Sequence, residues 1–261
     1  MKTERLSVET SGPTARVTLD RADARNALDG AMIRDLAETF ALLGRDPDVR
    51  CIVLDGAGPA FCAGADVDWM RASMQLSADE NRRDARTLAD ALRAVDECPK
   101  PVIGRVHGAA MGGGSGLVAV CDIVVAAEDA RFAFSEAKLG LVPGVISAFV
   151  VPRIGLSHAR RYFVTAEVFG AARAKEIGLV HETVPAEGLE GAVAELAKAI
   201  ANNGPRAVAE VKLLLRRQQG VDRAQALELG VDTIARLRTS PEAQEGLRAF
   251  LEKRPPGWAP K

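Results

Sequence analysis

The chain has 261 residues, of which 48% are hydrophobic and 26% charged, and its formal net charge at pH 7 is -1. This length and balance are typical of a globular protein with a sizeable core. The near-neutral charge gives no electrostatic footprint for nucleic acid, so we expect no nucleic-acid partner.

The sequence carries no signal of export, membrane insertion or metal binding. The opening residues MKTERLSVET lack the apolar core of a signal peptide. The longest apolar run, 108–121, is shorter than the roughly 18 residues of a membrane span. The four cysteines lack CxxC spacing, and the three histidines are scattered. We therefore expect a cytoplasmic protein with reduced thiols, no metal and no membrane partner.

The first part of the chain alternates strand and helix patterns. Residues 5–20 predict two short strands joined by a turn at 11–13. A helix follows, with Asp29 as its N-cap and Gly44 as its C-terminal stop. A buried strand over 49–58 then ends in a glycine-rich turn. The stretch FCAGADVDWM comes next and opens a polar helix that we expect to reach about Glu97.

The middle of the chain continues this alternation. Residues 101–128 predict a strand, a glycine turn, a helix and a strand. Residues 130–144 predict a strand that leads into a loop, and 145–167 are mostly helical. Residues 171–185 predict a helix, a glycine stop and a short strand. Alternating strands and helices favour an α/β layered core.

The end of the chain is different, because no strand pattern remains after about Val184. Three helices are predicted, over 205–219, 222–238 and 241–253. The first and third begin with proline, which suits the first helical position. The last carries an apolar stripe: Leu247, Phe250 and Leu251. Such a stripe must be buried, either against the chain's own core or against a partner subunit.

The stretch HGAAMGGGSGLVAVCD, 107–122, holds the most unusual pattern, three consecutive glycines in an apolar run. It is not a Walker loop, because no Lys-Ser or Lys-Thr pair follows. Leu117 stands where both G-x-G-x-x-G and the hydrolase elbow need glycine. Two interpretations stay open: a tight crossing of strand and helix, or a backbone site where a ligand meets amide groups.

A second glycine-marked turn, FCAGAD at 61–66, also follows a strand and opens a helix. Two such turns could each donate one amide to the same oxygen, which is the usual arrangement of an oxyanion hole. The pair therefore favours the backbone-site interpretation.

These two stretches resemble the signature regions of the enoyl-CoA hydratase/isomerase family, the crotonases, and AFLEKR at 249–254 resembles its C-terminal helix. The resemblance covers nearly the whole chain. It implies an α/β fold with a crotonase-like ββα spiral core over 1–200 and a C-terminal helical oligomerisation region over 201–261. It also implies an acyl-CoA substrate, assembly as a homotrimer or hexamer, and no cofactor beyond the CoA of the substrate.

The resemblance assigns the chemistry residue by residue. Ala63 and Gly113 match the oxyanion-hole donors, and Glu136 matches a catalytic glutamate. Hydratases of this family commonly carry a second glutamate where this chain has Gly116. Either the chemistry runs on one carboxylate, or a second group comes from elsewhere, or hydration is lost. One carboxylate in an apolar pocket can serve as both base and acid, because burial raises its pKa.

The resemblance also implies contacts to the substrate and its CoA. Arg25 matches a position near the CoA phosphates, and Asp66 one near the adenine. Phe250 and Lys253 match residues that reach CoA, often from a neighbouring subunit. Surface charge and core packing are the competing interpretations of these residues. The full set expected to bind substrate or CoA is Arg25, Ala65, Asp66, Gly112, Phe250 and Lys253.

The pattern is closest to bacterial methylglutaconyl-CoA hydratases of leucine breakdown and to relatives that act on isohexenylglutaconyl-CoA. The sequence therefore predicts a lyase that adds water to the 2,3-double bond of such an enoyl-CoA. Both substrates carry a distal carboxylate, for which Arg71, Lys138 and Arg153 are candidate partners. Two alternatives stay open: an isomerase that shifts a double bond with one glutamate, and a catalytically silent acyl-CoA-binding protein.

Overall fold

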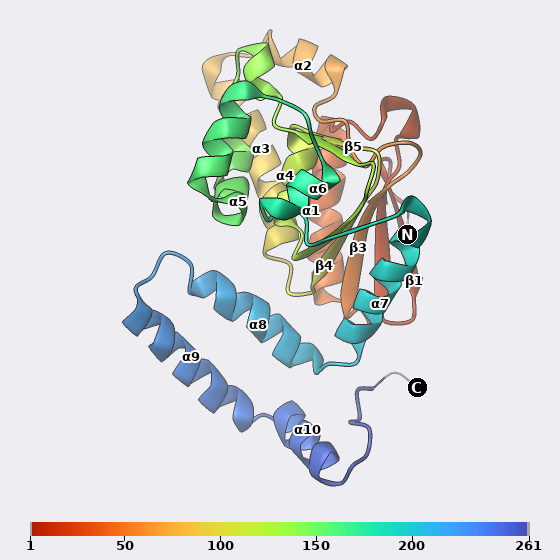
Figure 1. The fold of residues 1–261 in the computed structure, drawn as a ribbon, viewed down its shortest axis with the longest axis vertical. Helices are drawn as coiled ribbons and strands as arrows, with labels where there is room; N and C mark the ends of the chain where they lie inside the picture. The colour runs from red at the N-terminus through yellow and green to blue at the C-terminus, as the bar shows by residue number, and fades with distance from the viewer. Residues whose placement is uncertain (1, 260–261) are drawn as a thin grey trace.

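The computed structural model describes residues 2–259, and a six-stranded sheet forms its centre (Figure 1). The strand order is β1-β2-β3-β4-β6-β9, with β1 and β2 antiparallel and the other neighbours parallel. Their bounds are β1 Leu6–Ser11, β2 Thr14–Leu19, β3 Cys51–Gly56, β4 Val102–Val106, β6 Ile123–Ala127 and β9 Glu182–Val184. The predicted α/β alternation and the hairpin turn at 11–13 are confirmed.

A second sheet of three short strands stands beside the first: β5 Ala109–Met111, β7 Arg131–Ala133 and β8 Phe169–Gly170. Neither β5 nor β8 was predicted, because strands of two or three residues leave no alternation to detect. β5 also pairs with the turn after β3. The Cys62 amide donates to the Ala109 carbonyl, and the Met111 amide donates to the Cys62 carbonyl, both at 3.0 Å.

Helices cover both faces of the large sheet. The larger apolar cluster joins one face to α1 Gly30–Arg45, α3 Ala78–Asp96, α4 Gly113–Val120 and α5 Gly144–Thr165. The smaller cluster joins the other face to α7 Leu189–Ala201. Neighbouring residues of β3 divide between the two: Ile52 belongs to the larger cluster and Val53 to the smaller. This alternation is what a strand buried on both faces requires. The short α6 spans Ala171–Glu176.

Some predicted boundaries are corrected. The N-cap at Asp29 is confirmed, since its side chain accepts the Met32 amide at 2.8 Å, but the helix runs past Gly44 to Arg45. The single polar helix is two helices, α2 Val67–Ser73 and α3. The predicted helix is interrupted before Ser77, because Ser77 forms a capping box with Glu80 and so begins a new helix.

The three predicted C-terminal helices are confirmed as α8 Pro205–Arg217, α9 Arg223–Arg238 and α10 Pro241–Leu251. They extend away from the layered body (Figure 1). Lys212 of α8 ties them to it, since its ammonium lies 2.7 Å from a carboxylate oxygen of Asp122, which also accepts the Val102 amide at 2.7 Å.

The apolar stripe of α10 is not buried in this chain. Phe250 is 81% exposed, and its neighbours in the stripe are exposed as well. Within residues 2–259 the stripe is therefore not buried against the chain's own core, and its burial against a partner subunit stays a prediction. The division of the chain into a core over 1–200 and a helical region over 201–261 stays a prediction. Residues 1, 260 and 261 of these two ranges lie outside the described part.

Among residues 2–259, no helix combines the length and apolarity needed to cross a membrane.

Asn26 fastens the loop after β2 to the loop after β3. It is fully buried with a left-handed φ of 57°. Its amide nitrogen donates to the Ala57 and Ala60 carbonyls at 2.8 Å, and its oxygen accepts the Arg21 amide at 2.9 Å. The loop after β3 leads into the turn at 61–66, and the loop after β2 is hydrogen-bonded to that turn through Arg25 and Leu28, so this one side chain helps to fix its position.

We expect Asn26→Ala to lower the free energy of unfolding by about 2–4 kcal/mol, because three backbone groups, one buried and two partly buried, lose their partner. Urea denaturation measures the change. Asn203→Ala is the matched control, since Asn203 is exposed and its side chain has no hydrogen bond within residues 2–259. Equal midpoints for the two variants would contradict the role given to Asn26.

Candidate active site

The two glycine-marked turns meet at a cavity of about 380 Å³. The turn at 61–66 supplies one side of it and the start of α4 another. α2, α3, the start of α5 and the 3-10 turn Glu136–Leu139 complete the enclosure. Much of the lining is apolar: Leu28, Met70, Leu88, Leu139, Leu141, Val142, Val145 and Ile146. Such a cavity suits a small-molecule acyl group.

Backbone hydrogen bonds hold the turn at 61–66 from both sides. On one side Cys62 pairs with β5, as described above. On the other side the Leu28 amide donates to the Gly64 carbonyl at 2.7 Å, and the Asp66 amide donates to the Leu28 carbonyl at 3.0 Å. Residue 28 is therefore paired with the residues on either side of Ala65, and the amide of Ala65 points away from residue 28.

The predicted role of Ala63 is corrected by this geometry. The Ala63 amide donates to the Arg25 carbonyl at 2.9 Å, so it is not available to a ligand. The Ala65 amide donates to no acceptor within residues 2–259, and Ala65 lines the cavity. Gly64 separates the two with a left-handed φ of 101°, which rotates the following amide. That glycine was the available signal for preferring Ala65.

The start of α4 supplies a second unpaired amide. Gly112 has a φ of 48°, and its own amide donates to the Ala133 carbonyl at 2.9 Å. Gly113 is the first residue of α4, so its amide has no acceptor within the helix, and it finds none elsewhere in residues 2–259. Gly113 also lines the cavity.

The spacing of these two segments requires glycine. A Cβ on Gly114 would lie 2.4 Å from the Cys62 carbonyl oxygen, and one on Gly64 would lie 2.9 Å from the Met111 oxygen. The sequence left open whether the glycines mark a tight crossing or a backbone site for a ligand, and the structure is compatible with both at once. The segments cross tightly, and the crossing presents unpaired amides to the cavity. Two such donors can bind an oxygen that gains negative charge, and a helix N-terminus adds to the favourable field.

Glu136 brings a carboxyl group to the same place. A Cβ on Gly112 would lie 3.5 Å from Oε1 of Glu136, so this carboxyl lies beside the residue that precedes Gly113, and all three residues line the cavity. Oε2 is buried and has no hydrogen-bond partner among residues 2–259. Burial raises the pKa of Glu136 above the ordinary value of a glutamate. A carboxyl group of this kind is suited to take up and return a proton.

Gly116 has no room for a side chain. A Cβ there would lie 2.4 Å from Cγ2 of Ile146 and 3.1 Å from its Cβ. The place where the family commonly has a second glutamate is therefore filled by Ile146 of α5. Glu136 is the carboxyl group that remains beside the unpaired amides.

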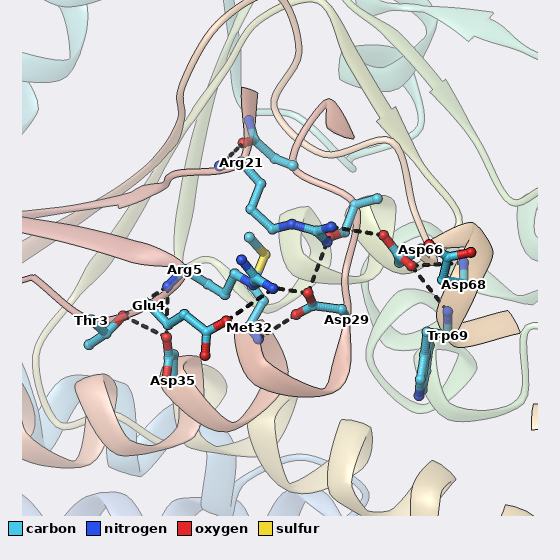
Figure 2. Close-up of polar contacts among 12 residues, drawn as sticks. Thr3, Glu4, Arg5, Arg21, Asp29, Met32, Asp35, Asp66, Asp68 and Trp69 are labelled. Atoms are coloured by element: carbon cyan, nitrogen blue, oxygen red, sulfur yellow. Dashed lines mark hydrogen bonds and ion pairs between the residues drawn. The ribbon is translucent and has the colours of Figure 1, made fainter. Parts of the chain in front are cut away.

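Asp66 makes contacts within the chain that position the turn, while its contact with CoA stays a prediction. Figure 2 shows its carboxylate held by Arg21 at 3.0 Å and by the amides of Asp68 and Trp69 at 2.9 and 3.1 Å. Burial opposes its charge, but these hydrogen bonds outweigh that effect and lower the pKa of Asp66. Asp66 is the N-cap of α2 and does not line the cavity.

Arg21 joins this turn to the first helix. Its guanidinium also lies 3.1 Å from the carboxylate of Asp29, the N-cap of α1, and donates to the Ala27 carbonyl at 2.9 Å. The three side chains form one chain of contacts, Asp29–Arg21–Asp66 (Figure 2). Since Asp66 follows Ala65 directly, Arg21 restrains the turn that presents the Ala65 amide. The sequence does not indicate this role, because nothing in the spacing of these residues links them.

The remaining residues expected at CoA lie outside the cavity. Arg25 is exposed, and its side chain has no partner within residues 2–259. Its carbonyl holds the Ala63 amide, so it stands next to the turn. Phe250 and Lys253 belong to the C-terminal region, which extends away from the cavity (Figure 1). Their contact with CoA stays a prediction that requires a second subunit.

The three candidate cations for a distal carboxylate also lie outside the cavity. Arg71 is exposed and pairs with Asp68 at 2.5 Å. Arg153 is turned to the C-terminal end of α4, where it donates to the Ala119 and Cys121 carbonyls. Lys138 is exposed on the 3-10 turn and does not line the cavity.

Comparison with known proteins places this geometry in context. A model of the enoyl-CoA hydratase/isomerase family matches residues 9–261. The chain is 36% identical to enoyl-CoA hydratase EchA19 of Mycobacterium tuberculosis, over 96% of this chain and 95% of that protein. It is 30% identical to the peroxisomal Delta(3,5)-Delta(2,4)-dienoyl-CoA isomerase of Arabidopsis thaliana, over 98% of this chain and 96% of that one.

The fold has close counterparts among solved structures. The crystal structure of an enoyl-CoA hydratase from Shewanella pealeana superimposes with a TM-score of 0.94 at 40% identity. That match covers 98% of this chain and 96% of the other. The expected crotonase-like fold with a C-terminal helical region is confirmed.

We expect Glu136→Gln to stabilise the folded chain at neutral pH. Burial raises the carboxyl pKa in the folded state only, so folding takes up a proton between the ordinary and the raised pKa. The stability of the natural chain therefore falls as pH rises through that interval, while the variant, which has no such proton, does not share the loss.

Urea denaturation at several pH values measures the effect. The difference in unfolding free energy should grow from acid pH up to the raised pKa and then stay constant. Glu128→Gln, at an exposed residue without a side-chain partner in the described chain, should show no such growth. A constant difference for Glu136→Gln at every pH would contradict the assignment.

We expect Arg21→Met to lower kcat on an enoyl-CoA thioester by about 10- to 100-fold, because displacement of the Ala65 amide costs transition-state binding. KM should change less than kcat. Arg34→Met, at an exposed residue of α1 whose side chain has no partner in the described chain, is the control. An unchanged kcat in a folded Arg21→Met protein would exclude the positioning role.

Proposed function

The chain belongs to the enoyl-CoA hydratase/isomerase family, and on that premise we propose that it adds water across the 2,3-double bond of an enoyl-CoA. Membership of the family implies an acyl-CoA substrate, and the geometry of the cavity supports the reaction. The observation that carries it is the meeting of two unpaired amides with a buried, unpartnered carboxylate oxygen.

In the proposed reaction the thioester carbonyl oxygen accepts hydrogen bonds from the amides of Ala65 and Gly113. The Glu136 carboxylate removes a proton from water as the water oxygen bonds to C3 of the substrate. The electron pair of the double bond moves toward C2, and negative charge develops on the thioester oxygen. Glu136 then returns the proton to C2, which gives a 3-hydroxyacyl-CoA.

The amides act mainly on the transition state, because the thioester oxygen carries more negative charge there than in the substrate. Loss of one such donor typically costs about 2.7–4 kcal/mol. The raised pKa of Glu136 supports a group that serves as base and then as acid. The reaction as proposed needs neither a metal nor a redox cofactor, since CoA arrives with the substrate.

An isomerase is the second candidate, and the packing at Gly116 is the observation that favours it. Ile146 occupies the position of a second glutamate, and an isomerase needs one carboxylate to move a proton between carbons. Water has to be activated only in the hydratase. The two reactions differ in whether solvent oxygen enters the product.

The acyl group is the finer part of the proposal. The sequence pattern favours 3-methylglutaconyl-CoA or isohexenylglutaconyl-CoA, whose distal carboxylate calls for a cation. Among residues 2–259, those that line the cavity include no lysine or arginine. The geometry therefore supports the reaction more strongly than it supports a dicarboxylic substrate.

Assembly and location complete the proposal. We infer a homotrimer or hexamer formed through the C-terminal helices, whose exposed apolar stripe is suited to such a contact. A cytoplasmic location stays part of the proposal.

Incubation with crotonyl-CoA in ¹⁸O-water tests the reaction. We expect loss of the enoyl-thioester absorbance and a 3-hydroxyacyl product that contains one solvent oxygen. Glu136→Gln should lower kcat by about 10²- to 10⁴-fold, the usual contribution of a general acid–base group. The acid limb of the pH–rate profile should lie above the ordinary glutamate pKa, because the ionised form starts the reaction.

Two results would contradict the hydratase proposal. A rearranged double bond without ¹⁸O, from a 3-enoyl-CoA, would establish the isomerase. Tight acyl-CoA binding without turnover of any enoyl-CoA, unaffected by Glu136→Gln, would establish a binding protein.

A further inference from the structure

One wall of the cavity is formed by α2 and α3, apart from the segment that carries Ser135 and Glu136. It carries three polar side chains, Ser73, Asn81 and Asp84, which we call the polar wall. None of them belongs to the turns that hold the thioester oxygen, and none has a part in the proposed reaction. They are therefore placed to contact the acyl chain.

The charge of the cavity has one sign. Of the described residues that line it, the charged ones are Asp84 and Glu136, and both are acidic. Glu136 is assigned to the reaction, so Asp84 is the charge that an acyl chain meets. A second negative charge nearby would be repelled, and no lining cation offsets the repulsion.

The hydrogen-bond donors of the polar wall are already used. The Ser73 hydroxyl donates to the Met70 carbonyl at 2.7 Å. The Asn81 amide nitrogen donates to three carbonyls of the α2–α3 connection, at 3.1 to 3.3 Å. These bonds fix the wall from within and leave its nitrogen unavailable to a ligand.

The acceptors of the wall are free. The Trp69 indole donates to Oδ1 of Asp84 at 3.1 Å, and Oδ2 takes part in no hydrogen bond within residues 2–259. The side-chain oxygen of Asn81 is also without a partner there. The wall therefore offers acceptors and negative charge, and it offers no free donor.

From this pattern we propose that the cavity selects an uncharged acyl chain, prefers one that carries a hydroxyl toward the polar wall, and rejects a carboxylated one. A hydroxyl can donate to Oδ2 of Asp84, which makes a charge-assisted hydrogen bond. A carboxylate would place its lone pairs against those of Asp84 and Asn81 without a donor between them. This inference rests on the proposed function and reverses the acyl group that the sequence pattern favours.

Matched thioesters test the selection. The short set is 2-pentenoyl-CoA, 5-hydroxy-2-pentenoyl-CoA and glutaconyl-CoA. The long set is 2-octenoyl-CoA, 8-hydroxy-2-octenoyl-CoA and 2-octenedioyl-CoA. In the set whose chain reaches the wall, we expect kcat/KM to be highest for the hydroxylated substrate. The carboxylated substrate should be about tenfold or more below the unsubstituted one in both sets.

Asp84→Asn tests whether the polar wall causes the discrimination. The variant removes the charge but keeps an oxygen that can accept the Trp69 indole. We expect the ratio of unsubstituted to carboxylated kcat/KM to fall about fivefold or more. Asp90→Asn is the matched control, since Asp90 lies on the same helix outside the cavity and pairs with Arg93. That control should leave the ratio unchanged.

A preference for the carboxylated member of either set would overturn the inference, as would an unchanged ratio in Asp84→Asn. If no thioester is hydrated, the proposed reaction fails, and the inference is then decided by binding. Calorimetry with the saturated pentanoyl-CoA, 5-hydroxypentanoyl-CoA and glutaryl-CoA makes that measurement without turnover. Glutaryl-CoA that binds as tightly as pentanoyl-CoA would overturn the inference on its own.

Discussion

The site depends on the close approach of two backbones, the start of α4 and the turn after β3. At Gly114 a Cβ would lie 2.4 Å from the Cys62 carbonyl oxygen, so no residue with a side chain could occupy that position without separating the two segments. Their contact sets the amides of Ala65 and Gly113 on one cavity. The proposed oxyanion site is thus a consequence of main-chain packing, and the backbone hydrogen bonds of Cys62 and Leu28 restrain it before any ligand binds.

The same rigidity holds a group that the fold would otherwise disfavour. Oε2 of Glu136 is buried without a partner within residues 2–259, and a buried unpaired carboxylate destabilises the folded state. The large apolar cluster beneath the site offsets that cost, because it joins the main sheet to four helices. Arg21 extends the support outward, since it joins the N-caps of two helices and so restrains the turn between them. A buried, unpartnered ionisable group is typical of a site in which reactivity is favoured over stability.

The sequence was sufficient to predict the fold and the two glycine-marked turns that meet at the cavity. Long elements such as α1 and α8 are marked by period and by cap, and the glycine turns stand out because their composition is unusual. What it could not give was the direction of single backbone groups. Ala63 and Ala65 have the same side chain, so the sequence does not distinguish them. The Ala63 amide is paired with the carbonyl of residue 25, whereas the pairing of residues 64 and 66 with residue 28 leaves the Ala65 amide free. The filling of Gly116 by Ile146 is likewise a contact between distant segments.

Reaction and substrate are determined by different parts of the molecule. In the proposed reaction, main-chain amides of the central layers bind the thioester oxygen and one carboxyl group transfers the proton. The acyl chain meets side chains of α2 and α3, which follow the turn but lie outside the crossing that requires glycine. Substitutions on these two helices can change the charge and hydrogen bonding of the cavity without separating the two backbones. A motif that identifies the crossing therefore constrains the bond that reacts, whereas in our proposal Asp84 and its neighbours select the acyl group.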